Sequence, residues 1–192
     1  MIKKKKIISH FSEKIDDREN IEEISSIIKK LIKYSEKEIS NHIEDINLIF
    51  DHQNFFTIDI SIKKNIDHIK SPSELKFDAK QECTQIINSC YKDQRIIQFF
   101  ISSIKLDKIE LKKIPKDLKD YSDIIFEFKL LCISVENFSY LKSIFSKNNL
   151  EIKNTFCSSV VRSFNYMNNF KNEKSIAFLD IGFLRSSLVL FK

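Results

Sequence analysis

Residues 175–182 read SIAFLDIG, and this stretch decides how we interpret the rest of the chain. Its apolar run predicts a buried strand that ends in Asp180, and Gly182 is the only glycine among the 192 residues. Glycine adopts positive φ without steric cost, so a strand followed by an acid and a glycine is typical of a turn that faces a phosphate.

The residues after this glycine do not suit a phosphate loop. Such loops need several glycines, because backbone N–H groups must approach the phosphate oxygens closely. Here the residues at 183–185 are Phe, Leu and Arg. The sequence therefore predicts a hairpin of strands at 175–181 and 187–191, joined by a turn that one glycine alone cannot make into a phosphate loop.

The amino-acid composition limits which classes of protein this chain can belong to. A hydrophobic fraction of 42% predicts a folded core, and the net charge of +5 is a small difference between 32 basic and 27 acidic residues. These charges are interspersed, which argues against a nucleic-acid surface; the run KKKK at 3–6 is interpreted as a solvated strand end. The 4 cysteines, in apolar stripes without CxxC spacing, indicate a reduced, cytoplasmic protein, with Cys83 and Cys90 on one buried helix face. No apolar run is long enough to span a membrane.

Periodicity predicts an α/β (α+β) protein. We expect strands at 2–11, 43–50, 56–62, 95–101, 104–111, 123–133, 150–155, 175–181 and 187–191, and helices at 21–37, 78–90, 135–148 and 158–167. Residues 66–74 are expected to form a loop, and Asp78 with Gln81 resembles a capping box. This order of elements favours a small domain inserted between two halves of an α/β domain.

Few residues suggest catalysis. His10, His42, His52 and His68 keep no metal-ligand spacing, and a single glycine excludes the GxSxG, GxGxxG and GxxxxGK[ST] motifs. Asp180 is the exception, because a carboxylate at the end of a buried strand needs a ligand, a cation or backbone donors.

The order of elements around Asp180 resembles FtsA, the actin-like bacterial cell-division protein. Residues 150–152 (LEI) correspond to the family's "LEV" strand, the loop ending at 172–174 (NEK) to "DEKELG", and residues 180–182 (DIG) to "DIGGGT". Upstream, residues 96–107 resemble the family's "IIHVIP…Y.LD" strands. The resemblance covers nearly the whole chain, but only the DIG motif is nearly identical.

This resemblance implies a partial actin-like (ribonuclease H-like) subdomain split by an inserted SHS2-like βαββ domain. The implied division is 1–65 and 150–192 for the actin-like subdomain and 66–149 for the insertion. The resemblance makes the turn at Gly182 the remnant of the family's second phosphate turn. Asp180 and Gly182 would lie near nucleotide phosphates or their Mg²⁺, and Arg185 would supply a compensating charge. The first phosphate turn, the second half of the fold, the FtsZ-contacting surface and the membrane-binding C-terminal helix of the family have no counterpart in this sequence.

We therefore expect a division scaffold that acts through divisome proteins and self-association, without ATP hydrolysis. It would lie in the cytoplasm, at the inner face of the membrane at the division site, with membrane contact only indirect or through a missing C-terminal helix. No cofactor is expected, and ATP with Mg²⁺ would bind only if the site is completed elsewhere. Partner binding is expected on a strand face that carries Lys105 and Lys108.

Three alternatives remain open from the sequence. The first is an ATP-binding actin-like or heat-shock-chaperone-like protein whose second half is missing from this chain. The second is a pilus-assembly actin homologue of the PilM type, which shares the split fold. The third, motivated only by the lysine run and the net charge, is a small nucleic-acid-binding module.

Overall fold

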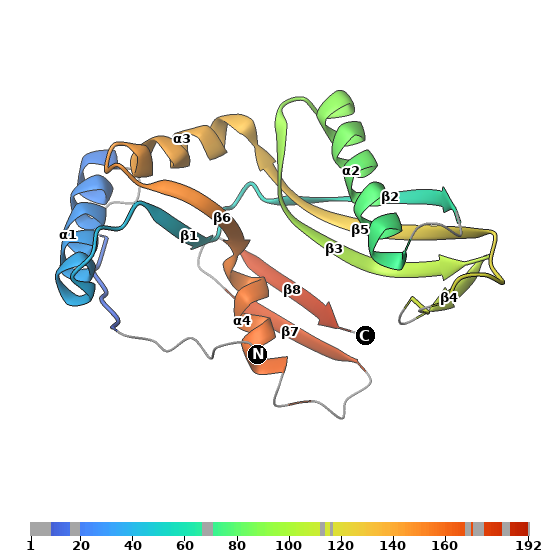
Figure 1. The fold of residues 1–192 in the computed structure, drawn as a ribbon. Coiled ribbons are helices and arrows are strands. Elements are labelled where there is room, and N and C mark those ends of the chain that lie inside the picture. Colours follow the sequence, from blue (N-terminus) through green and yellow to red (C-terminus); the bar gives the residue numbers. More distant parts are fainter. Residues whose placement is uncertain are drawn as a thin grey trace. The chain divides into compact units, whose positions relative to one another are not determined.

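Four helices and eight strands form the part of the protein that the computed structural model describes, residues 9–15, 20–66, 71–111, 114–115, 117–167, 170, 175–181 and 185–191 (Figure 1). In chain order they are α1 (Ile21–Ile39), β1 (Asp45–Phe50), β2 (Phe56–Asn65), α2 (Pro72–Cys90), β3 (Gln94–Leu106), β4 (Ile109–Leu111), β5 (Asp123–Ser134), α3 (Val135–Ser146), β6 (Glu151–Cys157), α4 (Ser158–Met167), β7 (Ile176–Ile181) and β8 (Ser186–Phe191). The mixed α and β class predicted from periodicity is confirmed.

The chain forms two compact units, and each is discontinuous in sequence. The first consists of Met1–Leu48 and Asn137–Thr155, and the second of Ile49–Glu136 and Phe156–Lys192. The long segment 49–136 therefore interrupts the first unit, and the chain returns to that unit at α3.

The first unit combines α1, α3 and the pair of strands β1 and β6. The Asn20 side chain caps α1 by accepting hydrogen bonds from the N–H groups of Glu22 and Glu23, each at 3.1 Å. Two side-chain hydrogen bonds connect β1 and β6: Lys153 donates to Asp45 at 2.9 Å, and Asn154 donates to Asn47 at 2.7 Å. Strands far apart in the sequence are thus neighbours in one sheet.

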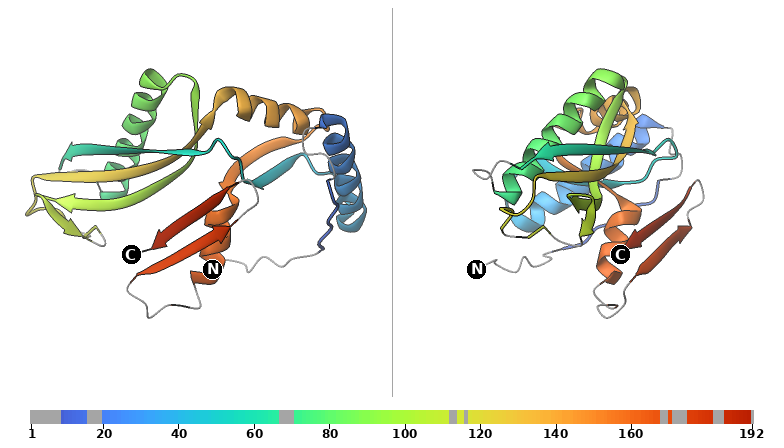
Figure 2. Two further views of the ribbon diagram at one scale, coloured as in Figure 1. Left: turned by 180° about the vertical axis from the view of Figure 1, so that it is seen from behind. Right: turned by 90° about the vertical axis from the view of Figure 1, so that its right-hand side faces the viewer.

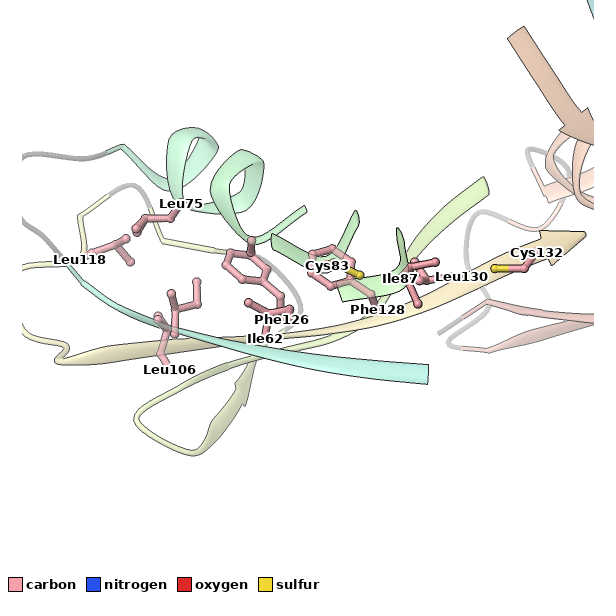
Figure 3. Packing of buried hydrophobic residues seen from close by; sticks show 12 residues of the cluster. Ile62, Leu75, Cys83, Ile87, Leu106, Leu118, Phe126, Phe128, Leu130 and Cys132 are labelled. Carbon is pink, nitrogen blue, oxygen red and sulfur yellow. The ribbon is translucent and has the colours of Figure 1, made fainter. Parts of the chain in front are cut away.

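The second unit is built on a four-stranded antiparallel sheet in the order β2-β5-β3-β4, with α2 on one face. Alternate residues of β5 are buried in one cluster with residues of this helix: Ile124, Phe126, Phe128, Leu130 and Cys132. Figure 3 shows the last four of them. They meet the residues of α2 spaced four apart, Leu75, Ala79, Cys83 and Ile87. Burial of this apolar surface stabilises the unit.

Helix α2 begins at Pro72 and not at residue 78, so the predicted loop at 66–74 is wrong for residues 72–74; residues 67–70 lie outside the described part. Ser71 caps the helix, and its capping-box partner is Glu74, not the predicted pair Asp78 and Gln81. Proline is favoured in the first turn of a helix, where its missing N–H has no acceptor to lose. Pro72 therefore starts α2 and does not interrupt a loop.

The predicted strands at 95–101 and 104–111 are one strand, β3, and its short hairpin partner β4. Register shifts between Ile96 and Gln98 and between Ile101 and Ser103 interrupt the pairing of β3 with β5 without ending the strand. The β3–β4 turn consists of Asp107 and Lys108, both at positive φ. The Asp107 carboxylate stabilises it by accepting the N–H groups of Ser122 and Asp123 at 3.1 and 3.0 Å.

Two further expectations differ from the structure. Strand β2 runs to Asn65 and pairs with β5 along its whole length, so the implied boundary between residues 65 and 66 separates β2 from the strand that it pairs with. Of the predicted strand at 2–11, residues 2–8 lie outside the described part, and residues 9–11 are not a strand. Phe11 instead contacts the ring of Tyr34 in α1, with the ring centroids 5.9 Å apart.

Candidate functional site

The β7–β8 hairpin that the opening stretch predicts is confirmed. The two strands are antiparallel, and Asp180 lies opposite Ser187. On the inner face of the hairpin, the rings of Phe178 and Phe191 pack against each other. This face packs on α4, where Phe164 contacts Phe191 and Tyr166 contacts Phe178. Figure 2 shows α4 on one face of the hairpin. The turn with Gly182 lies outside the described residues.

The outer face of the hairpin is apolar and exposed. It consists of Ala177, Leu179, Ile181, Leu188 and Leu190, which alternate along the two strands with the inward residues. No element of the described part of the second unit is paired with the free edges of the hairpin.

Asp180 meets a cation supplied by the chain itself. Arg162 of α4 donates from Nη1 to both carboxylate oxygens, at 3.2 Å each. The sequence predicted that a carboxylate at the end of this strand needs a ligand, a cation or backbone donors, and Arg162 is such a cation. A carboxylate ligand of Mg²⁺ offers its oxygens to the metal, whereas those of Asp180 face a guanidinium.

Arg185 is likewise occupied within the chain. Its Nη1 donates to the backbone oxygen of His52 at 3.1 Å and lies 3.4 Å from Oδ1 of Asp51. Its guanidinium lies over the Phe55 ring, 5.2 Å from the centroid, and only 22% of the Arg185 side chain is exposed. Arg185 thus links the start of β8 to the turn between β1 and β2. Its guanidinium already has partners within the chain and is not available to bind a phosphate.

His52 completes this cluster around Arg185. Its Nδ1 accepts the backbone N–H of Asn54 at 3.1 Å, which places the proton of the neutral ring on Nε2. Burial lowers the pKa of His52 below its ordinary value; the charge of Asp51 opposes this shift, and the charge of Arg185 adds to it. The neutral imidazole is therefore the form that the fold favours.

Three of the four cysteines lie in the core. Cys83, Cys132 and Cys157 are buried, whereas Cys90, predicted to share the buried face of α2, is exposed because it is the last residue of the helix. Burial raises the pKa of the Cys83 and Cys132 thiols to about 11. Among the residues that the structure describes, no group of three or more His, Cys, Asp or Glu side chains could hold a metal ion.

The strand face expected to bind a partner carries charges that are paired within the sheet. Lys105 forms an ion pair with Glu127 of the neighbouring strand, and Lys108 lies in the positive-φ turn. Lys129 pairs with Asp59 at 2.7 Å, and Lys63 pairs with Asp123 at 2.6 Å. Reversing the charge of Lys105 would therefore break a contact inside the protein and could not report on partner binding alone.

Arg162 and Asp51 are the site residues that sequence reasoning missed. Arg162 is 18 positions from Asp180, and Asp51 is 134 positions from Arg185, so no local spacing connects either pair. The only sequence signal was the requirement that Asp180 find a cation.

No protein-family model matches the sequence, and none of the curated proteins matches it either. Within the described part of the chain, none of the helices combines the length and the apolar character that crossing a membrane requires.

Proposed function

We propose that this chain is an FtsA-like scaffold of bacterial cell division that acts through protein–protein contacts. One observation carries the proposal: in the sequence, a unit with its own helix-covered core separates β1 from β6, and these two strands are neighbours in one sheet. The FtsA resemblance implies this arrangement, in which an inserted SHS2-like domain divides an actin-like subdomain. The elements of the helix-covered unit follow the order β2-α2-β3-β4-β5, one strand more than the βαββ order that the resemblance implies. The insertion would begin with β2 and end with β5, earlier at both ends than the implied range of 66–149.

The chemistry at the hairpin supports a scaffold and not an ATPase. In the resemblance, Asp180, Gly182 and Arg185 stand where a phosphate turn would be. Asp180 is neutralised by Arg162, and Arg185 is held by Asp51 and the oxygen of His52. Binding of Mg-ATP here would have to break both contacts before it formed any of its own.

The proposed setting is the cytoplasmic face of the membrane at the division site. There the chain would contact divisome proteins and other copies of itself. Membrane contact would be indirect, or would come through a C-terminal helix outside this sequence.

Controlled depletion of the protein in its own cells tests this role. Loss of a division scaffold predicts long, undivided cells, and expression of the intact chain should restore normal cell length. Depleted cells of normal length that have lost their surface pili would instead favour the pilus-assembly alternative. Normal length with unchanged pili would contradict both.

A further inference from the structure

Strand β2 is the long open edge of the four-stranded sheet. It pairs with β5 from Phe56↔Cys132 to Asn65↔Asp123, and no strand of the described residues pairs with its other side (Figures 1 and 2). Along such an edge, alternate residues direct unpaired N–H and C=O groups outward, where another strand can bind them. At the opposite edge, β4 has only 3 residues and covers residues 104–106 of β3. The remainder of β3 pairs with β5 through two register shifts, so it is a less regular template than β2.

The side chains of β2 alternate strictly between the two faces of the sheet. Ile58, Ile60 and Ile62 belong to the helix-covered side and contribute to its core. The other face carries the polar residues Thr57, Asp59, Ser61 and Lys63, all of them exposed. Asp59 and Lys63 lie the same distance along the strand on either side of Ser61.

We propose that β2 pairs with β2 of a second copy of this chain, antiparallel and with Ser61 at the twofold axis. In this register Asp59 of each copy lies opposite Lys63 of the other, and Ile60 lies opposite Ile62. The two four-stranded sheets become one continuous sheet. This inference rests on the proposed function, of which it specifies the self-association.

Charge alternation across the joined edge supports this register. Within one copy, Lys129 already contacts Asp59 and Asp123 already contacts Lys63, at 2.7 and 2.6 Å. The dimer extends these contacts into a row of alternating sign that runs from Lys129 and Asp59 of one copy to Lys63 and Asp123 of the other. Side chains of Asp59 and Lys63 remain 67% and 59% exposed, which leaves both able to meet a second partner.

The same charges disfavour other registers. A pairing centred on Asp59 would place two aspartates opposite each other, and one centred on Lys63 would place two lysines opposite each other. Pairing about Ile60 would leave Asp59 opposite Ser61, without the ion pairs. Charged residues on an edge strand usually prevent association, and opposite charges directly across a strand pair favour it. Here they select one self-complementary register.

Sedimentation equilibrium of the full chain tests the proposal with the variants Asp59→Lys and Lys63→Asp. Each variant alone places like charges opposite each other at two symmetric positions. We expect each to weaken dimerisation at least about tenfold relative to the unmodified chain.

An equimolar mixture of the two variants should dimerise again, as a heterodimer. At one of the two symmetric positions, the lysine introduced by Asp59→Lys lies opposite the aspartate introduced by Lys63→Asp. At the other position, the original Lys63 of the first variant lies opposite the original Asp59 of the second. Opposite charges therefore face each other at both positions, although neither variant regains its contact within the sheet. Recovery in the mixture is thus the decisive result.

Lys76→Asp is the matched control. It makes the same change of charge as Lys63→Asp, but on the exposed side of α2, away from the edge, and should leave dimerisation unaltered. Circular dichroism verifies that every variant is folded.

A chain that stays monomeric at all accessible concentrations overturns the inference, and so does a dimer that both edge variants leave unchanged. Failure of the mixture to restore a dimer lost in both variants overturns it as well. A wild-type monomer whose β2 binds a strand of another protein would assign the edge to a different occupant and overturn the pairing of two copies. None of these results would alter the depletion phenotype, so failure of this interface is distinguishable from failure of the division role.

Discussion

Phe126 is the residue whose replacement tests the packing of α2 on the four-stranded sheet most sharply. Its side chain is 0% exposed, and its ring stacks on that of Phe128 with centroids 5.9 Å apart and planes at 18°. Phe126→Ala removes this buried surface and leaves a cavity between β5 and α2. For a fully buried phenylalanine this change costs about 3–5 kcal/mol, a large part of the roughly 5–15 kcal/mol that stabilises a typical domain.

Phe77→Ala provides a control with the same chemistry. Phe77 belongs to α2 of the same sheet-and-helix unit, but its side chain is 58% exposed, so its replacement should cost within about 0.5 kcal/mol. Urea unfolding followed by circular dichroism measures both variants. With a slope of about 2 kcal/mol per molar urea, Phe126→Ala should lower the midpoint by about 2 M, and Phe77→Ala should barely move it. Equal losses, or a loss below about 1 kcal/mol for Phe126→Ala, would refute the packing of α2 on β5.

Three further predictions concern reactivity, pH and ligands. In the native protein at neutral pH, an alkylating reagent should label Cys90 rapidly, and the buried Cys83, Cys132 and Cys157 only after unfolding. The raised pKa of Cys83 and Cys132, about 11, slows their reaction further. Mass spectrometry of labelled peptides measures this, and fast labelling of Cys132 would contradict it. The pKa of His52 is lowered in the folded state, so between that value and about 6.5 the unfolded state binds more protons, and stability should fall as pH decreases through this window. His52→Asn keeps an acceptor for the Asn54 N–H and should reduce the dependence of the free energy of unfolding on pH. An unchanged pH dependence in this variant would contradict the assignment to His52. Isothermal titration of the chain with Mg-ATP should show no binding, and micromolar affinity would refute the degenerate site.

Features with a local signal were predictable from the sequence. The amphipathic period of α1 placed that helix correctly, because its apolar residues recur at helical spacing behind an N-capping residue. The alternation in β2 and the sharp change from β5 to α3 at Ser134 were equally clear. Each of these signals is confined to a few neighbouring residues.

Features that depend on competing or distant interactions were not predictable. Pro72 could end a loop or begin a helix, and only the reciprocal contacts of Ser71 and Glu74 decide in favour of the helix. The irregular pairing of β3 with β5 lets one strand continue where its apolar pattern breaks. The cation for Asp180 comes from α4, on a packing face that no sequence spacing reveals.

Localisation of the intact chain in dividing cells tests the proposed scaffold role most directly. A fluorescent fusion that restores cell length after depletion should collect in a band at the division site and remain there during constriction. Uniform fluorescence throughout the cytoplasm, or foci that coincide with pilus bases and never with the division site, would contradict the proposed function.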